Sequence, residues 1–180
     1  VEEGTSSRQR VIAGTLAANG INILSAHIHT RADGIALDTL QVNDSSGEAV
    51  TEESRWTRVL QDLRRVIRGG EPVEALLEER HRQREPVSAP GSPKVTIENQ
   101  LSDSHTVVEV KCPDRVGLLY LITRTLAREG LNIASARIAT EIDHAFDAFY
   151  VTDSQGRKLE DPEAIDRVRE ALEQALVVTL

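Results

Sequence analysis

The chain has 180 residues, enough for one or two small domains that each enclose a modest core. Hydrophobic residues make up 39% and charged residues 28%, as in an ordinary globular protein and unlike a disordered one. The net charge of −8 argues against a broad nucleic-acid surface, which would need a basic face. No apolar run approaches the ~18 residues of a membrane span, so we expect neither nucleic acid nor a membrane as a partner.

The first half of the chain predicts a helix, two strands and a second helix. The first helix is expected over 8–19 and the strands over 22–30 and 35–43. The second helix is expected over 52–67, with its apolar residues facing inward: Trp56, Leu60, Leu63 and Ile67. Nothing before residue 8 has the pattern of a first strand, so we expect that strand to be lost, disordered or supplied from upstream.

A helical arm and a linker are predicted between the two halves, over 71–93. The arm covers Val73–Glu85, and a segment rich in Pro, Ser and Gly follows it. Val95–Glu98 is interpreted as the last strand of the first half. Two groups of arginines are interpreted as a solvated helix face, with a basic contact surface as the alternative. They are Arg64, Arg65 and Arg68, and Arg80, Arg82 and Arg84.

The second half predicts the element order β-α-β-β-α-β of a ferredoxin-like domain. A strand over Thr106–Lys111 precedes a helix whose apolar residues recur at helical spacing: Leu119, Ile122 and Leu126. Strands are expected from Asn132 onward and over Phe146–Thr152, with a turn at 142–144 between them. A helix begins at Asp161-Pro162 and faces inward through Ile165, Val168, Leu172 and Ala175, and Val177–Leu180 is expected to close the sheet.

The two halves are predicted to be copies of one domain. A shift of 110 residues places Thr15–Thr30 on Thr125–Thr140 with ten identities in sixteen positions. With one residue deleted in the next turn, three further pairs align: Asp38 with Asp147, Asp44 with Asp153, and Gly47 with Gly156. We therefore expect two α+β domains, over 1–100 and 101–180. Each would have an antiparallel sheet with its helices on one face, and the first copy would lack its first strand.

A strand, the motif DRVGLL and a helix follow one another over 107–133, and this arrangement resembles the ACT domain family. ACT domains are small regulatory modules, usually paired, that bind amino acids at interfaces between copies. The segments HIHTRADGIALDTLQVND, VTIEN, LNIASARIAT and FYVTD are also similar to one particular ACT pair. It is the C-terminal pair of the bacterial bifunctional uridylyltransferase/uridylyl-removing enzymes, which modify the PII nitrogen-signalling protein.

The resemblance implies glutamine as the first candidate effector, with catalytic domains upstream in a parent chain as intramolecular partners. This chain has no motif of a nucleotidyltransferase or of the associated hydrolase. We therefore expect no catalytic residue and no cofactor here. The single Cys112 favours a reducing, cytoplasmic compartment, and the absence of Met predicts a fragment of a longer protein.

The DRVGL loop holds the first candidate binding residues: Asp114, Arg115, Gly117 and Leu118. It leads into a helix whose first amides lack internal partners, so an α-carboxylate would be stabilised there. Gly117 would let a ligand approach the backbone, and Asp114 could accept hydrogen bonds from an ammonium group. The alternative is that Asp114 only caps the helix and that Gly117 only permits the turn.

A second group of candidates stands at the strand entrances: Asn132 and Ile133, and less strongly their copies Asn22 and Ile23. An asparagine amide offers both a donor and an acceptor to a polar ligand, although Asn also follows helix-ending glycines for purely structural reasons. In the first copy Gly4 stands in the place of Asp114 and Ser7 in that of Gly117. These replacements put a ligand site in that copy in doubt.

Metal and nucleophile chemistry have weaker signals. His27 and His29 are two apart on a predicted strand, but no third ligand is evident, so we expect solvent-facing histidines and no metal site. Cys112 has no identifiable base partner and is expected to be a small buried residue.

Two functions compete. The first is an allosteric sensor that binds an amino acid at the DRVGL loop, formed by pairing of the two domains within the chain or by a homodimer. The second is a structural or dimerisation module of another metabolic enzyme or regulator, without any ligand. An autonomous enzyme is poorly supported.

Overall fold

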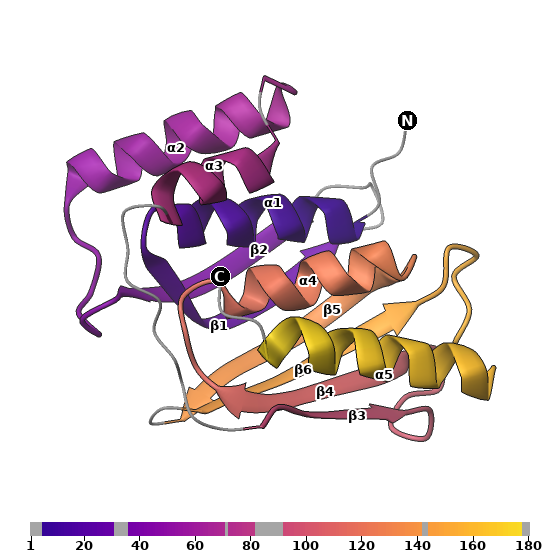
Figure 1. Cartoon of the computed structure of the whole chain (residues 1–180). Coiled ribbons are helices and arrows are strands. Elements are labelled where there is room, and N and C mark those ends of the chain that lie inside the picture. The colour runs from indigo at the N-terminus through magenta and orange to yellow at the C-terminus, as the bar shows by residue number, and fades with distance from the viewer. Residues whose placement is uncertain (1–4, 31–35, 71, 82–91, 142–143, 178–180) are drawn as a thin grey trace.

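One six-stranded antiparallel sheet organises the molecule, and the described helices all lie on one of its faces (Figure 1). This computed structural model describes residues 5–30, 36–70, 72–81, 92–141 and 144–177. The strand order is β2-β1-β5-β6-β4-β3. The strands are β1 (Ile21–Thr30), β2 (Ala36–Asp44), β3 (Lys94–Glu98), β4 (Thr106–Pro113), β5 (Asn132–Glu141) and β6 (His144–Thr152). The helices are α1 (Thr5–Ala18), α2 (Glu53–Ile67), α3 (Val73–His81), α4 (Leu118–Arg128) and α5 (Pro162–Val177).

The internal repeat is confirmed by irregular features that recur at matching positions. The pairing of β1 with β2 shifts register between Ile23 and Ser25, and the pairing of β5 with β6 shifts between Ile133 and Ser135. The turns after β2 and β6 also match, since Gly47 and Gly156 both have a positive φ. Because bulges and positive-φ glycines are local devices, their recurrence shows that both halves use one plan.

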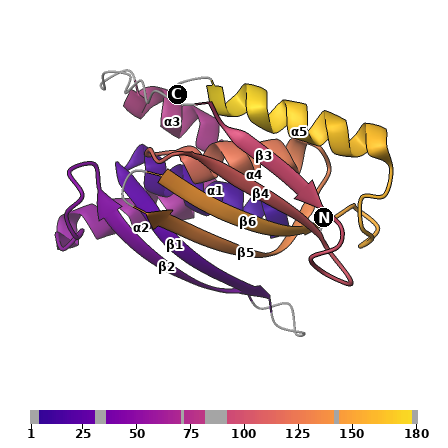
Figure 2. The ribbon, with the colours of Figure 1, turned by 90° about the horizontal axis from the view of Figure 1, so that it is seen from below.

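The two halves share the sheet through β1 and β5. Ser25 to His27 pair with Arg137 to Ala139 in antiparallel register. On the covered face Ala26 lies opposite Ile138, and both side chains are buried. Figure 2 shows β1 and β5 side by side in the continuous sheet, with β2 outside β1 and β6 next to β5. The two repeated units are therefore joined edge to edge and enclose one core.

The helix layer joins the halves a second time, at a glycine. Gly14 of α1 lies against α4 and α3: a Cβ atom there would be 2.8 Å from Cδ2 of Tyr120 and 2.6 Å from Cγ2 of Val73. The Tyr120 hydroxyl donates to Oε1 of Glu74 over 3.2 Å. The side chain of Arg10 reaches the same oxygen at 3.0 Å. The close approach of these three helices therefore depends on the missing side chain of residue 14.

The short strand before the second unit belongs to a different part of the sheet than expected. Val95–Glu98 is a strand, as predicted, but its assignment as the last strand of the first copy is wrong. β3 pairs along its whole length with β4, from Lys94 opposite Lys111 to Glu98 opposite Val107. The short connection between β3 and β4 favours this pairing, because a short loop costs less chain entropy to close than a long one.

Two further expectations about packing are wrong. On α2 the buried residues are Val59, Asp62 and Val66, while of the predicted residues Trp56 packs against the core and Leu63 is half-buried. Leu60 and Ile67 remain 50% and 66% exposed. The predicted closing strand fails at Val177, which is the last residue of α5, while 178–180 lie outside the described residues. The arm is helical over Val73–His81, and the predicted linker lies largely outside the described residues. The division of the chain at residue 100 stays a prediction.

We expect Gly14→Ala to lower the melting temperature. On an open helix surface this change stabilises by roughly 1 kcal/mol through helix propensity. Here the added methyl group meets Val73 and Tyr120 below 3.0 Å, and overpacking of this kind costs about 1–3 kcal/mol. Thermal unfolding followed by circular dichroism decides the sign, and a higher melting temperature would contradict the packing described above.

Candidate effector site between the two repeats

The loop between β4 and α4 is shaped by Gly117. This residue is the N-cap of α4 and has a φ of +88°, a conformation that costs a residue with a Cβ free energy. Its carbonyl accepts the amide N–H of Leu121 at 3.0 Å and so begins the helix. Since Asp114 lies three residues before this N-cap, the alternative that Asp114 only caps the helix is wrong.

Asp114 is instead bound by the other repeat. The side-chain amide of Asn22, at the start of β1, donates to Oδ2 of Asp114 over 2.6 Å. The backbone N–H of Arg115 donates to the same carboxyl group. Burial raises the pKa of Asp114, and these two hydrogen bonds act in the opposite direction. One residue from each repeat thus forms a polar junction between the two units.

Asp114 and Asn132, both predicted ligand-binding residues, do not lie together. Asn132 begins β5, whereas Pro113 pairs with His144 at the far end, where His144 also pairs with Glu141. Nine residues of strand correspond to roughly 30 Å. Asn132 donates to the carbonyl of Asp153 at 3.4 Å. The repeats pair antiparallel through β1 and β5. The asparagine beside Asp114 is therefore Asn22, the copy of Asn132 in the first repeat.

The other predicted site residues have structural contacts. Arg115 donates from Nη2 to the carbonyl of Leu176 at 2.7 Å, which ties the loop to the end of α5. Leu118, Ile23 and Ile133 are buried in the core. Their side chains therefore position the loop and the strand ends. Gly4 lies outside the described residues, and Ser7 is in the first turn of α1.

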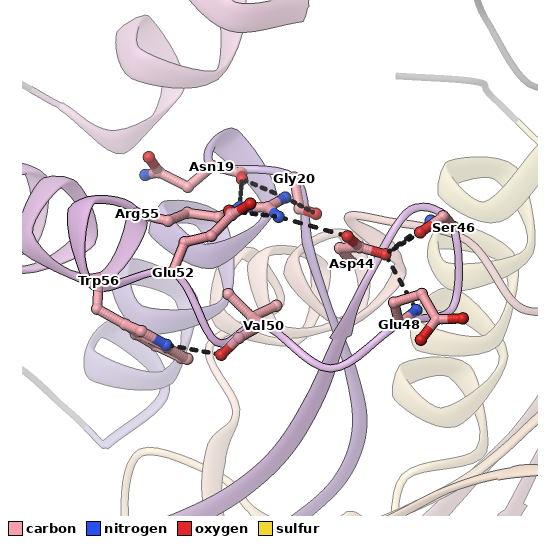
Figure 3. Close-up of polar contacts among 9 residues, drawn as sticks. All are labelled: Asn19, Gly20, Asp44, Ser46, Glu48, Val50, Glu52, Arg55 and Trp56. Carbon is pink, nitrogen blue, oxygen red and sulfur yellow. Dashed lines mark hydrogen bonds and ion pairs between the residues drawn. The ribbon is translucent and has the colours of Figure 1, made fainter.

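An arginine of α2 holds the chain just before Asn22. Arg55 donates to the carbonyls of Asn19 and Gly20, at 3.2 and 3.0 Å from Nη2, and lies 3.5 Å from a carboxylate oxygen of Asp44 (Figure 3). Asp44 itself accepts the hydroxyl of Ser46 at 2.6 Å, the leading cause of its lowered pKa. These bonds fix the end of α1 and the entrance of β1, and with them the position of Asn22.

A buried carboxyl group near the junction was not among the predicted site residues. Asp147 on β6 is buried opposite Val110 of β4. Burial raises its pKa to about 7; the N–H of Ala139 counteracts this, and the charge of Asp114 adds to it. Oδ1 of Asp147 has no hydrogen-bond partner in the described part of the chain. The alignment of Asp147 with Asp38 in the repeat was the only signal for it.

The remaining sequence candidates are not assembled into a site. Cys112 is buried as predicted, and burial raises the pKa of its thiol to about 11. His27 and His29 lie in β1, but their side chains are outside the described set. Among the described residues no group of three or more His, Cys, Asp or Glu side chains is placed to hold a metal ion. None of the described helices is long and apolar enough to cross a membrane.

Comparison with protein families agrees with this architecture. The family described as "ACR9-like, ACT-like domain" matches residues 94–180. The matched region contains β3, the loop with Asp114, and the whole of the second unit. The chain therefore contains an ACT-like domain, and its α+β sheet is consistent with two ACT-like units.

The curated relatives are more specific. The chain is 38% identical over 176 residues to the bifunctional uridylyltransferase/uridylyl-removing enzyme of Rhodospirillum rubrum, covering 94% of this chain and 18% of the relative. It is 39% identical over 166 residues to the enzyme of that name from Gluconobacter oxydans, covering 89% and 17%. No solved structure gives a significant match.

The chain is homologous to the C-terminal region of bifunctional uridylyltransferase/uridylyl-removing enzymes. It spans less than one fifth of the length of these two relatives.

Asp147→Asn should flatten the pH dependence of stability between about pH 4 and 7. The folded protein retains the Asp147 proton to about pH 7, whereas an unfolded carboxyl group loses it near 3.8. Folding therefore becomes less favourable as the pH rises through this window, by on the order of a few kcal/mol at most. Urea unfolding at pH 4.5 and 7.5 measures the effect. Equal pH slopes for both proteins would contradict the raised pKa.

Proposed function

We propose that this region senses an amino acid, with glutamine as the first candidate, and regulates catalytic domains of a parent uridylyltransferase/uridylyl-removing enzyme. The observation that carries the proposal is the junction of Asp114 and Asn22, at which a loop of one ACT-like unit meets a strand of the other. The homology to the C-terminal region of these enzymes supports the regulatory assignment. The isolated chain acts through binding and is not itself an enzyme.

The chemistry of the junction suits a zwitterionic ligand. Asp114 supplies a carboxyl group for an α-ammonium group, with the buried Asp147 nearby. The first amides of α4, which begins after Gly117, form the partial positive end of the helix dipole and suit an α-carboxylate. Asn22 can donate to or accept from a ligand amide. An amino acid with a side-chain amide therefore matches the polar groups present.

Regulation follows if the ligand and the Asn22–Asp114 bond compete. An ammonium group bound to Asp114 replaces the donor that Asn22 supplies, so the ligand favours an arrangement in which the two units are less tightly linked there. A ligand shifts a conformational equilibrium only by its difference in affinity for the two states. Loss of the hydrogen bond between the units provides such a difference in affinity. Arg115 donates to the carbonyl of Leu176 and so connects a movement of the loop to the end of α5.

A structural module without a ligand is the second candidate. The 2.6 Å bond satisfies Asn22 and Asp114 with each other, as a latch between the units would. In that case the junction contributes to stability alone, and the ACT-like pair serves to hold other domains together.

Isothermal titration with glutamine distinguishes the two functions. The unmodified chain should bind glutamine saturably, and Asp114→Asn should weaken binding by about tenfold or more, equivalent to ~1.4 kcal/mol. Asn22→Ala should strengthen binding, because it removes the donor that competes with the ligand for Asp114. Asn132→Ala is the matched control, because it removes the same side chain from the other repeat at the opposite end of the sheet.

Thermal unfolding of each variant separates loss of binding from loss of structure. Selective binding of another amino acid would support the sensor function and identify that amino acid, in place of glutamine, as the effector. No binding by the folded chain, combined with a lower melting temperature for Asn22→Ala, would support the structural latch and refute the sensor.

A further inference from the structure

Asp147 is a buried carboxyl group whose presence packing does not explain. It lies on β6 with 3% of its surface exposed, and its Oδ1 atom has no hydrogen-bond partner in the described part of the chain. The backbone N–H of Ala139 on β5 donates to the carboxyl group. A buried polar group with incomplete hydrogen bonding costs free energy, so an aspartate at this place in a core points to a role beyond stability.

The position of Asp147 is close to the proposed effector site. Val110 of β4 lies opposite Asp147, and β4 then continues through Cys112 to the loop with Asp114. Burial is the main cause of the raised pKa of the Cys112 thiol, and the charges of Asp147 and Asp114 both add to it. Burial also raises the pKa of Asp147 most, with a further contribution from Asp114. The two carboxyl groups therefore lie within electrostatic reach of each other at the junction of the units.

Neither carboxyl group has a cation beside it among the described residues. The donors that reach them are neutral: the side-chain amide of Asn22 and the N–H of Arg115 for Asp114, and the N–H of Ala139 for Asp147. Two neighbouring carboxyl groups cannot both ionise without mutual repulsion, and the more buried one retains its proton more strongly. An added positive charge would remove this repulsion, so the junction has the electrostatic character of a cation site.

We infer that Asp147 is a second carboxylate of the effector site, which releases its proton when the ammonium group of an amino acid binds at Asp114. The inference rests on the function proposed above, because it needs that ligand at that place. A positive charge favours the ionised form of a nearby carboxyl group, most strongly where water is excluded. Binding thus exchanges a proton, which passes to the solvent, for an ammonium group.

This exchange makes the site selective for ligands that carry a positive charge on the α-nitrogen. A ligand whose α-nitrogen is acylated brings no charge and leaves the proton on Asp147. The sign of the pH dependence follows from the same linkage: the ligand binds better to the ionised form, so its affinity falls as the pH falls through about 7.

The titratable groups around Asp147 do not supply this proton in its place. On β4 the neighbour on the same face is Cys112, whose pKa of about 11 keeps the thiol protonated. Ile138 of β5 is apolar, and the buried residues of α1 and α4 include none that carries a charge. His144 lies three residues away on β6 and so points to the other face of the sheet. Asp114 remains as the charge that the ligand meets directly.

Isothermal titration of the chain with glutamine, at pH 7.0 in buffers of different ionisation enthalpy, counts the protons released. The unmodified chain should release about half a proton per glutamine, because a group with a pKa of about 7 is half protonated there. Its affinity should fall about threefold from pH 7.5 to pH 6.5. Asp147→Asn should release none and lose this pH dependence. N-acetylglutamine, which lacks the ammonium group, should release no proton from the unmodified chain.

Asp38→Asn is the matched control, because it makes the same change at the matching position of the first repeat. Asp38 pairs with Ile28, six residues along β1 from Asn22, which is roughly 20 Å of strand. This variant should release protons as the unmodified chain does. If Asp147→Asn fails to fold, NMR of ¹³C-labelled aspartate carboxyl groups in the unmodified chain replaces it: glutamine at pH 7.0 should move the Asp147 signal to its ionised position.

Glutamine binding without proton release, or with equal release in Asp147→Asn and the unmodified chain, would overturn the inference and leave the proposed function standing. An Asp147 signal that glutamine does not shift would have the same meaning. Binding of no amino acid by the folded chain would refute the proposed function and this inference with it.

Discussion

The pairing of β1 with β5 is the contact on which the rest of the molecule depends. Three residue pairs, centred on Ala26 and Ile138, turn two short half-sheets into one. A small sheet buries too little apolar surface to be stable alone, so sharing an edge lets both units use a single core. Above the pairing, Gly14 allows α1 and α4 to approach closely enough to cover it. Strand pairing and helix packing therefore fix one relative orientation of the repeats.

That orientation creates the candidate site. Since the repeats meet antiparallel, the start of β1 lies at the same end of the sheet as the loop after β4, and Asn22 reaches Asp114. The same geometry carries Asn132 to the opposite end. The acidic character of the junction also has a tertiary origin, because β6 contributes Asp147 and burial keeps its pKa near 7. A ligand at this place would touch both units, as an allosteric effector must if it is to change how they are joined.

The asymmetry between the units is as informative as their likeness. The turns after β2 and β6 are each stabilised by an aspartate, Asp44 and Asp153 respectively, and hydrogen bonds hold the pKa of each carboxyl group below its usual value. Yet, within the described residues, only the second unit has a hairpin outside β6 and a fully seated second helix. The first unit instead holds α2 through polar contacts, in which buried Asp62 accepts from Asn19 and Arg80. These contacts keep α2 in place while Leu60 and Ile67 stay exposed.

The sequence by itself determined the elements and the repeat, because helix and strand periods and the turn glycines are local properties of the chain. Periodicity located the described helices and strands of the second unit, but it also predicted a final strand that Val177 does not form. What periodicity cannot give is the partner of each element. The placement of β3 beside β4, the exposure of Ile67 and the joining of Asp114 to Asn22 depend on contacts between residues far apart in the chain. Only the tertiary structure decided these, because edge-to-edge pairing of two similar units fixes which end of one repeat meets which end of the other.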